Sequence, residues 1–231
     1  AVRLMPRITL GLADKLAYKS LNVEQYNRSS AYNKPGFKPV HTECTDVELV
    51  PTAPIPDDID GVFLRNGTNL QFPETRGRSH MFNGAGMLHQ VQVRNGKASY
   101  TNVYVKTPRY RVEESAGEDV YLHFGDIAGG GKAGFLRMMI TALQQRLGVI
   151  PKLDVLESGN NTTAIQFHHE KLYCLQETGY PFALETRVEQ GCLRLSGNGQ
   201  FDTFSGKLDA PFTAHPKIDP ATGDWFAFST E

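Results

Sequence analysis

Apolar and polar residues alternate along much of the chain after Gly61, and this period of two predicts β-strands with one buried face. The clearest alternation runs over residues 87–94 and stops at Asn95-Gly96. Both of these turn residues accept positive φ, so they predict a hairpin whose second strand covers Ala98–Val105.

Shorter apolar runs predict further strands before and after this hairpin. We expect them at residues 47–50, 62–64, 162–167, 171–176, 182–186, 217–218 and 225–229. The turn-forming residues predict turns at Asn66-Gly67, His169-Glu170, Ser196–Gln200 and 219–223. Repeated hairpins of this kind favour an all-β barrel or propeller.

Two stretches have apolar residues at helical spacing instead, Arg7 to Asn22 and Phe135–Val149. In the second stretch the residues at helical spacing are Leu136, Met139, Ile140, Leu143 and Leu147, and the first four of them form the candidate membrane-facing side. Each helix could cap the β-core or lie on a membrane surface. Lys132, Arg137 and Arg146 favour the membrane surface for the second helix, because cations bind anionic lipid headgroups.

The pattern predicts three regions. An amphipathic helix occupies residues 1–25, and a polar, proline-rich connection that carries one early strand occupies residues 26–60. A β-domain fills residues 61–231 and is interrupted by the helical insertion at 135–149.

Composition removes several classes of function. With 24 basic and 25 acidic residues, the net charge of −1 gives no electrostatic basis for binding nucleic acid. The three cysteines, Cys44, Cys174 and Cys192, are too scattered for a disulfide framework. No apolar run approaches the roughly 20 residues of a membrane span.

Two glycine-rich segments invite a nucleotide-binding interpretation, and neither supports it. GDIAGGGKAG has Asp126 where a phosphate-binding loop needs glycine, and Ala133 where it needs a hydroxyl. NGAGMLH has His89 in place of the third glycine of a dinucleotide fingerprint. We interpret both segments as loops.

The seven histidines do not show the local spacing of a metal site. Adjacent His168 and His169 would point to opposite faces of a strand, so they could not bind one ion together. From composition alone, each histidine is expected to be a surface residue or a core residue with satisfied hydrogen bonds.

One long phrase around His215, PFTAHPKIDPATGDWFAF, resembles an iron-ligand segment of the carotenoid cleavage dioxygenases, the family that also contains retinoid isomerohydrolases. The segments GVFLRNGTNLQFP, HMFNGAGMLHQVQVRNGKASYTNVYVKTPR and NNTTAIQFHHEKLYCLQETGYPFALE agree with that family in order and spacing. The resemblance runs from about Cys44 to the end of the chain. It is strongest to the cytosolic plant-type branch, which cleaves carotenoids and apocarotenoids.

The resemblance implies part of a seven-bladed β-propeller with amphipathic helical insertions and Fe(II) held by four histidines. His215 matches the first of these ligands, and Glu177 matches a carboxylate that accepts the other ring N–H of a ligating histidine. Residues Leu136, Met139, Ile140 and Leu143 lie on the helix that this family turns toward the membrane. The implied substrates are a carotenoid or apocarotenoid and O2, with no organic cofactor and no catalytic residue beyond the metal site.

No other histidine in the chain matches the family's remaining three ligand motifs. We therefore expect the N-terminal portion of a longer dioxygenase, inactive by itself, in the cytoplasm at membrane surfaces, with the plastid as the alternative location. The alternative function is a truncated, catalytically inactive partial propeller that acts as a binding or interaction module.

Overall fold

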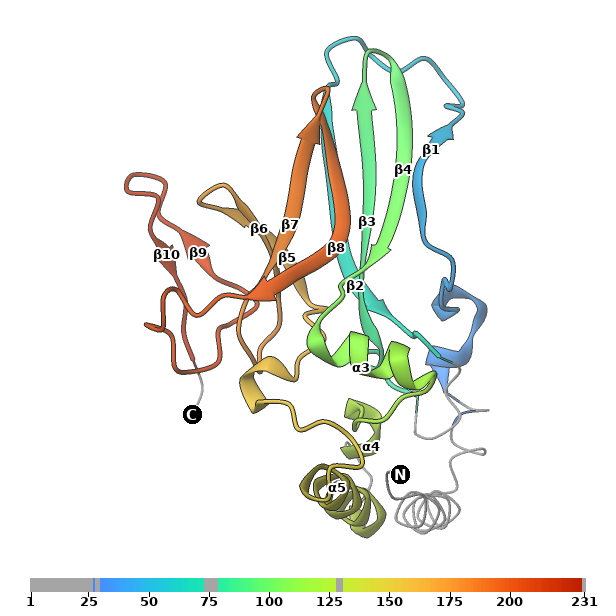
Figure 1. Cartoon of the computed structure of the whole chain (residues 1–231). Helices are drawn as coiled ribbons and strands as arrows, with labels where there is room; N and C mark the ends of the chain where they lie inside the picture. The colour runs from blue at the N-terminus through green and yellow to red at the C-terminus, as the bar shows by residue number, and fades with distance from the viewer. Residues whose placement is uncertain (1–26, 28–29, 73–78, 128–130, 230–231) are drawn as a thin grey trace. The chain divides into compact units, whose positions relative to one another are not determined.

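The computed structural model describes residues 27, 30–72, 79–127 and 131–229. Its regular structure is mostly β-sheet with few helices (Figure 1). The chain divides into two compact units, one of residues 1–40, 69–84 and 111–153, and one of residues 41–68, 85–110 and 154–231. The helix expected over residues 1–25 lies outside the described residues, and the predicted domain boundaries stay a prediction.

The second unit contains two four-stranded sheets. The first has the order β1-β4-β3-β2 and consists of β1 (Cys44–Leu49), β2 (Gly61–Asn69), β3 (Ala85–Arg94) and β4 (Lys97–Tyr104). The second has the order β5-β6-β7-β8 and consists of β5 (Ala164–His168), β6 (Lys171–Leu175), β7 (Phe182–Glu189) and β8 (Cys192–Phe201).

Strands β3 and β4 form the predicted hairpin and lie side by side in Figure 1. Val93 pairs with Ala98 across the turn. Asn95 and Gly96 have φ values of 50° and 70°, which is the left-handed backbone that a two-residue hairpin turn requires.

Two other predicted turns are wrong, because the turn-forming residues lie inside strands. Asn66-Gly67 belongs to β2, and Ser196–Gln200 belongs to β8. In β8 the glycines allow close approach of the backbone, since a Cβ at Gly199 would lie 2.1 Å from the Ala183 carbonyl oxygen. The turn between β7 and β8 is at residues 190–191 instead, where both φ values are positive.

The core of this unit lies on both faces of β6. Leu172 and Cys174 belong to a buried cluster with side chains of β3, β4, β7 and β8. Tyr173 and Leu175 point the other way, because side chains alternate along a strand, and they pack in a second cluster with Phe212. A strand buried on both faces explains the nearly continuous apolar run over these residues.

The predicted C-terminal hairpin is present but short, with β9 (Lys217–Ile218) paired to β10 (Trp225–Phe226). Its Trp225 ring lies 4.9 Å from the ring of Phe212 and 5.2 Å from that of Tyr173, measured between centroids. These aromatic contacts attach the hairpin to the second core cluster.

The first unit carries helices α4 (Phe124–Ile127) and α5 (Gly131–Arg146), and α3 (Pro108–Ala116) begins just before it. The loop predicted for GDIAGGGKAG is therefore wrong at both ends, because α4 and α5 occupy them. A Cβ at Gly134 would lie 2.6 Å from the carbonyl oxygen of Asp126. That glycine serves helix packing rather than phosphate binding. Short 3-10 turns, η1 (Ala31–Asn33), η2 (Pro35–Phe37) and η3 (Val155–Glu157), complete the regular structure.

Candidate functional site

His215 lies two residues before β9, at the end of a buried segment. Thr213 and Ala214 are each 2% exposed, whereas the side chain of His215 is 65% exposed. The backbone N–H of His215 donates to Oγ1 of Thr213 over 3.1 Å. The imidazole is thus an accessible group on a firmly anchored backbone.

Glu177 lies two residues after the end of β6, and the structure brings it next to His215. Its Oε1 atom is 3.2 Å from Nε2 of the imidazole, which is hydrogen-bond distance. The two residues are 38 positions apart in the sequence, so no local motif could have indicated the contact. A carboxylate in this position can hold the ring in one tautomer and one orientation.

The turn that carries Glu177 is fixed to the segment that carries His215. The backbone N–H of Phe212 donates to the carbonyl oxygen of Gly179 over 3.1 Å. Asn161 is fully buried, and its Nδ2 donates to the carbonyl oxygens of Cys174 and Tyr180 over 2.8 and 2.9 Å. Sequence reasoning missed Asn161, and its only sequence signal is that Asn tolerates the positive φ of 47° found there.

Among the described residues, no group of three or more His, Cys, Asp or Glu side chains is arranged to hold a metal ion. His215 and Glu177 supply one imidazole and one carboxylate, whereas stable iron sites in proteins use more ligands. The donor types suit Fe(II), but these two residues by themselves do not form a complete iron site.

Three other histidines have different partners. Nδ1 of His89 is 2.5 Å from the Tyr100 hydroxyl, and Nε2 of His123 is 3.3 Å from the Asp119 carboxylate. The ring of His168 lies tilted against that of Trp225, with centroids 4.6 Å apart.

The expectation that His168 and His169 point to opposite faces is wrong. Their ring centroids are 4.6 Å apart. His168 ends β5, whereas His169 lies in the following turn with a φ of 43°, so strand alternation does not apply to it. Burial lowers the pKa of His168, and the neighbouring His169 lowers it further.

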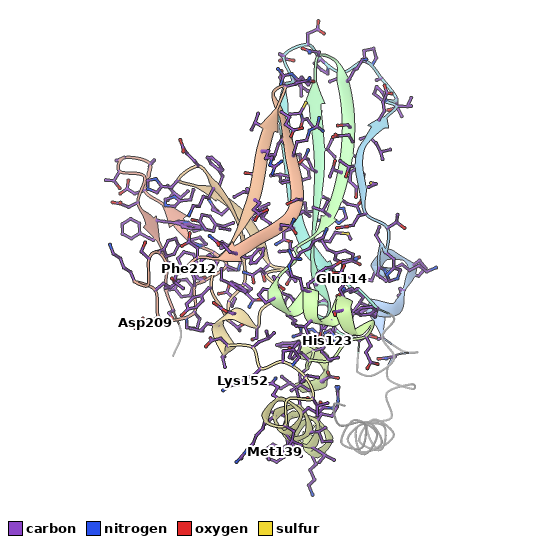
Figure 2. The ribbon with its side chains drawn as sticks, viewed as in Figure 1. Glu114, His123, Met139, Lys152, Asp209 and Phe212 are labelled. Atoms are coloured by element: carbon purple, nitrogen blue, oxygen red, sulfur yellow. The ribbon has the colours of Figure 1, made fainter. Side chains whose placement is uncertain are left out.

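The apolar side chains of α5 that the sequence assigned to a membrane face differ in exposure. Leu136, Met139 and Leu143 are 48%, 53% and 43% exposed, and Met139 is labelled on the helix in Figure 2. Ile140 is only 7% exposed, so it adds no accessible apolar surface.

Arg137 was expected to offer positive charge to a membrane surface, and its placement contradicts this. Its side chain is buried and forms an ion pair with Asp126 of α4. Helices in the described part of the chain lack the combination of length and hydropathy needed to cross a bilayer.

Comparison with known proteins places this fold in a family. The model of the RPE65 family, described as retinal pigment epithelial membrane protein, matches residues 37–231. A carotenoid 9,10(9',10')-cleavage dioxygenase 1 of Arabidopsis thaliana is 35% identical over 233 residues, covering 96% of this chain and 41% of that protein. The chain belongs to the RPE65 and carotenoid oxygenase family. A Crocus sativus carotenoid 9,10(9',10')-cleavage dioxygenase is 34% identical over 200 residues, covering 85% of this chain and 35% of that protein, which agrees with the plant-type branch.

Solved structures of carotenoid oxygenases and their relatives share the fold. The crystal structure of Pseudomonas brassicacearum lignostilbene dioxygenase matches with a TM-score of 0.66 and 25% identity, covering 87% of this chain and 37% of that one. Cobalt-substituted Synechocystis ACO matches with a TM-score of 0.58 and 23% identity, covering 85% and 39%. The chain thus spans about two fifths of the length of the relatives that it matches.

Proposed function

We propose that His215 and Glu177 belong to the iron site of a dioxygenase that cleaves a conjugated carbon–carbon double bond of carotenoids or apocarotenoids with O2, giving carbonyl products. The observation that carries the proposal is the 3.2 Å contact between Nε2 of His215 and Oε1 of Glu177. Membership of the carotenoid oxygenase family supports the reaction class.

In this proposal each of the two side chains has a separate role. Glu177 would accept a hydrogen bond from Nε2–H of His215, which would leave Nδ1 unprotonated and available as a metal ligand. Iron(II), when bound, supplies the one-electron and O2 chemistry that cleavage of a polyene requires. The protein's own residues orient the imidazole and keep its lone pair available.

The remaining ligands would come from outside the described residues, because these contain no complete metal-binding group. Such an arrangement suits a β-propeller, in which innermost strands of different blades each direct one residue to the common axis. We propose that the two four-stranded sheets and the β9–β10 hairpin are parts of such a seven-bladed propeller.

The test uses a version of this protein extended to the full length of its relatives. His215→Ala should abolish bound iron and cleavage, measured by metal analysis of the purified protein and by chromatography of apocarotenoid products. His41→Ala removes an exposed imidazole outside the site and serves as the matched control. Full iron content and full turnover in His215→Ala would overturn the assignment.

Glu177→Gln gives a graded second test. It should lower iron affinity or activity by roughly 10–100-fold, which is the usual effect of losing a residue that orients a metal ligand. Iron content and cleavage rate equal to those of the unmodified protein would show that Glu177 has no such role.

A second candidate function is a partial propeller that acts as a binding or interaction module. The absence of a three-ligand group from the described residues favours it for this chain. Metal analysis and an aerobic apocarotenoid assay of the extended protein distinguish the two, because a binding module would remain poor in iron and catalytically silent at that length as well.

A further inference from the structure

Gln176 directly precedes Glu177, and both the oxygen and the nitrogen of its side-chain amide form hydrogen bonds. Its Oε1 accepts hydrogen bonds from the backbone N–H groups of Asn160 and Asn161, each over 3.0 Å. Its Nε2 donates to Oγ1 of Thr178 over 3.2 Å. The side chain therefore connects the turn that carries Glu177 to the segment before β5.

Gly159 makes room for the side-chain amide of Gln176. A Cβ at Gly159 would lie 1.7 Å from Nε2 of Gln176, so a larger residue at that position would displace the amide from where it lies. Beyond Glu177, the backbone N–H of Tyr180 donates to the carbonyl oxygen of Leu156 over 2.8 Å. A Cβ at Gly179 would be 2.6 Å from that same oxygen. Residues 156–161 therefore contact the turn that carries Glu177 both before and after Glu177.

The position of Glu177 relative to His215 depends on these attachments. The side chain of Glu177 itself is 48% exposed, so burial in the core does not fix its carboxylate. Its turn is held at Gln176 on one side, and at Gly179, which accepts from the N–H of Phe212, on the other. Phe212 begins the segment that ends at His215.

We propose that Gln176 is a positioning residue, which sets the distance between the Glu177 carboxylate and the His215 imidazole through its hydrogen bonds to Asn160 and Asn161. The importance of that distance for catalysis rests on the proposed function. The geometric claim concerns only this chain's own residues and can be tested without turnover.

The test measures the coupling between His215 and Glu177 in the 231-residue chain. Coupling here means the change in the Nε2 chemical shift of His215 that Glu177→Gln causes. In 15N-labelled protein, the Nε2 chemical shift of His215 is recorded with and without Glu177→Gln. Because Nε2 and Oε1 are in contact, this substitution should change the shift. In a Gln176→Ala background, the change caused by Glu177→Gln should be lost, since residues that act through one another are not additive.

Three further variants separate positioning from general stability. Gly159→Ala should give the same loss of coupling, because the new Cβ displaces the Gln176 amide from the opposite side. Gln176→Glu keeps an oxygen acceptor for the two N–H groups and should restore the coupling. Gln200→Ala removes an exposed glutamine side chain from β8 and should leave the coupling unchanged.

An unaltered coupling in Gln176→Ala would overturn the proposal, as would a His215 signal that does not respond to Glu177→Gln in the unmodified chain. Should Gln176→Ala fail to fold, Gly159→Ala decides the question, because an unaltered coupling in that variant would also overturn the proposal. Failure of the proposed function has a different signature, because the extended protein would then lack iron and turnover while the coupling persisted.

Discussion

Arg137 of α5 forms an ion pair with Asp126 of α4, and both side chains are buried. Asp126 also accepts a hydrogen bond from the backbone N–H of His123 over 2.9 Å through its second oxygen. Helix α5 therefore turns a charged residue inward, while Met139 and Leu143 remain exposed. An ordinary surface helix has the reverse arrangement.

Breaking this ion pair on one side should strongly destabilise the first unit. Asp126→Asn removes the carboxylate charge that faces the buried Arg137 guanidinium, and breaking a buried ion pair on one side typically costs about 3–5 kcal/mol. Urea unfolding followed by circular dichroism measures the loss. Lys171→Gln is the control, because it breaks a pair with Asp202 in which the lysine is 52% exposed, and exposed pairs contribute about 1 kcal/mol or less. Equal losses in the two variants would contradict this account of Arg137.

The exposed apolar face of α5 should bind a lipid surface. Replacing Met139 and Leu143 by Ser removes accessible apolar area and should reduce sedimentation with anionic liposomes, while the circular dichroism spectrum stays the same. Ile140→Ala is the matched control, since this buried side chain should affect stability rather than liposome binding. Unchanged sedimentation in the Met139/Leu143 variant would favour a purely structural role for the helix.

Strand periodicity predicted much of the sheet structure, because alternation and turn residues are local signals. Asn95-Gly96 and His169-Glu170 are indeed turns with positive φ. The same dipeptide chemistry failed at Asn66-Gly67, where long-range contacts decide the structure: Nδ2 of Asn66 donates to the carbonyl oxygens of Asn161 and Ala164 over 2.7 and 3.0 Å.

The candidate site was less accessible to sequence reasoning than the strands. Only the resemblance to a family points to His215 and Glu177, since neither stands in a local metal-ligand pattern. Their contact, and the hydrogen bonds of Gln176 that hold it, join segments far apart in the chain. Periodicity carries no information about such contacts, because they arise only when the sheets have packed.

Asn66 should contribute to stability through the two carbonyl groups that it satisfies. Asn66→Asp keeps the shape of the side chain but removes the donor, so the carbonyl oxygens of Asn161 and Ala164 lose a partner. We expect the free energy of unfolding to fall by about 1–3 kcal/mol, the usual cost of an unsatisfied buried polar group. Gln200→Ala is the control, and a loss no larger than in that variant would contradict the assigned role.

His89 should remain neutral at a lower pH than an ordinary histidine does. Burial lowers its pKa, and the nearby positive charge of Arg65 lowers it further. The unfolded chain therefore binds a proton at higher pH than the folded chain does. The stability that this group contributes is fully present above about pH 6.5, the ordinary histidine pKa, and is lost as the pH falls from there through the lowered pKa of the folded chain.

A titration of the histidine ring signals by NMR measures this pKa directly. Arg65→Gln removes the smaller of the two causes, so the pKa of His89 should rise but stay below its ordinary value. Lys97→Gln is the control, because it removes a positive charge from the end of β4 next to the turn. Lys97 pairs with Arg94 and not with His89, so the pKa of His89 should stay unchanged. A pKa of His89 at or above its ordinary value in the unmodified chain would show that the imidazole is not desolvated at its position beside Tyr100.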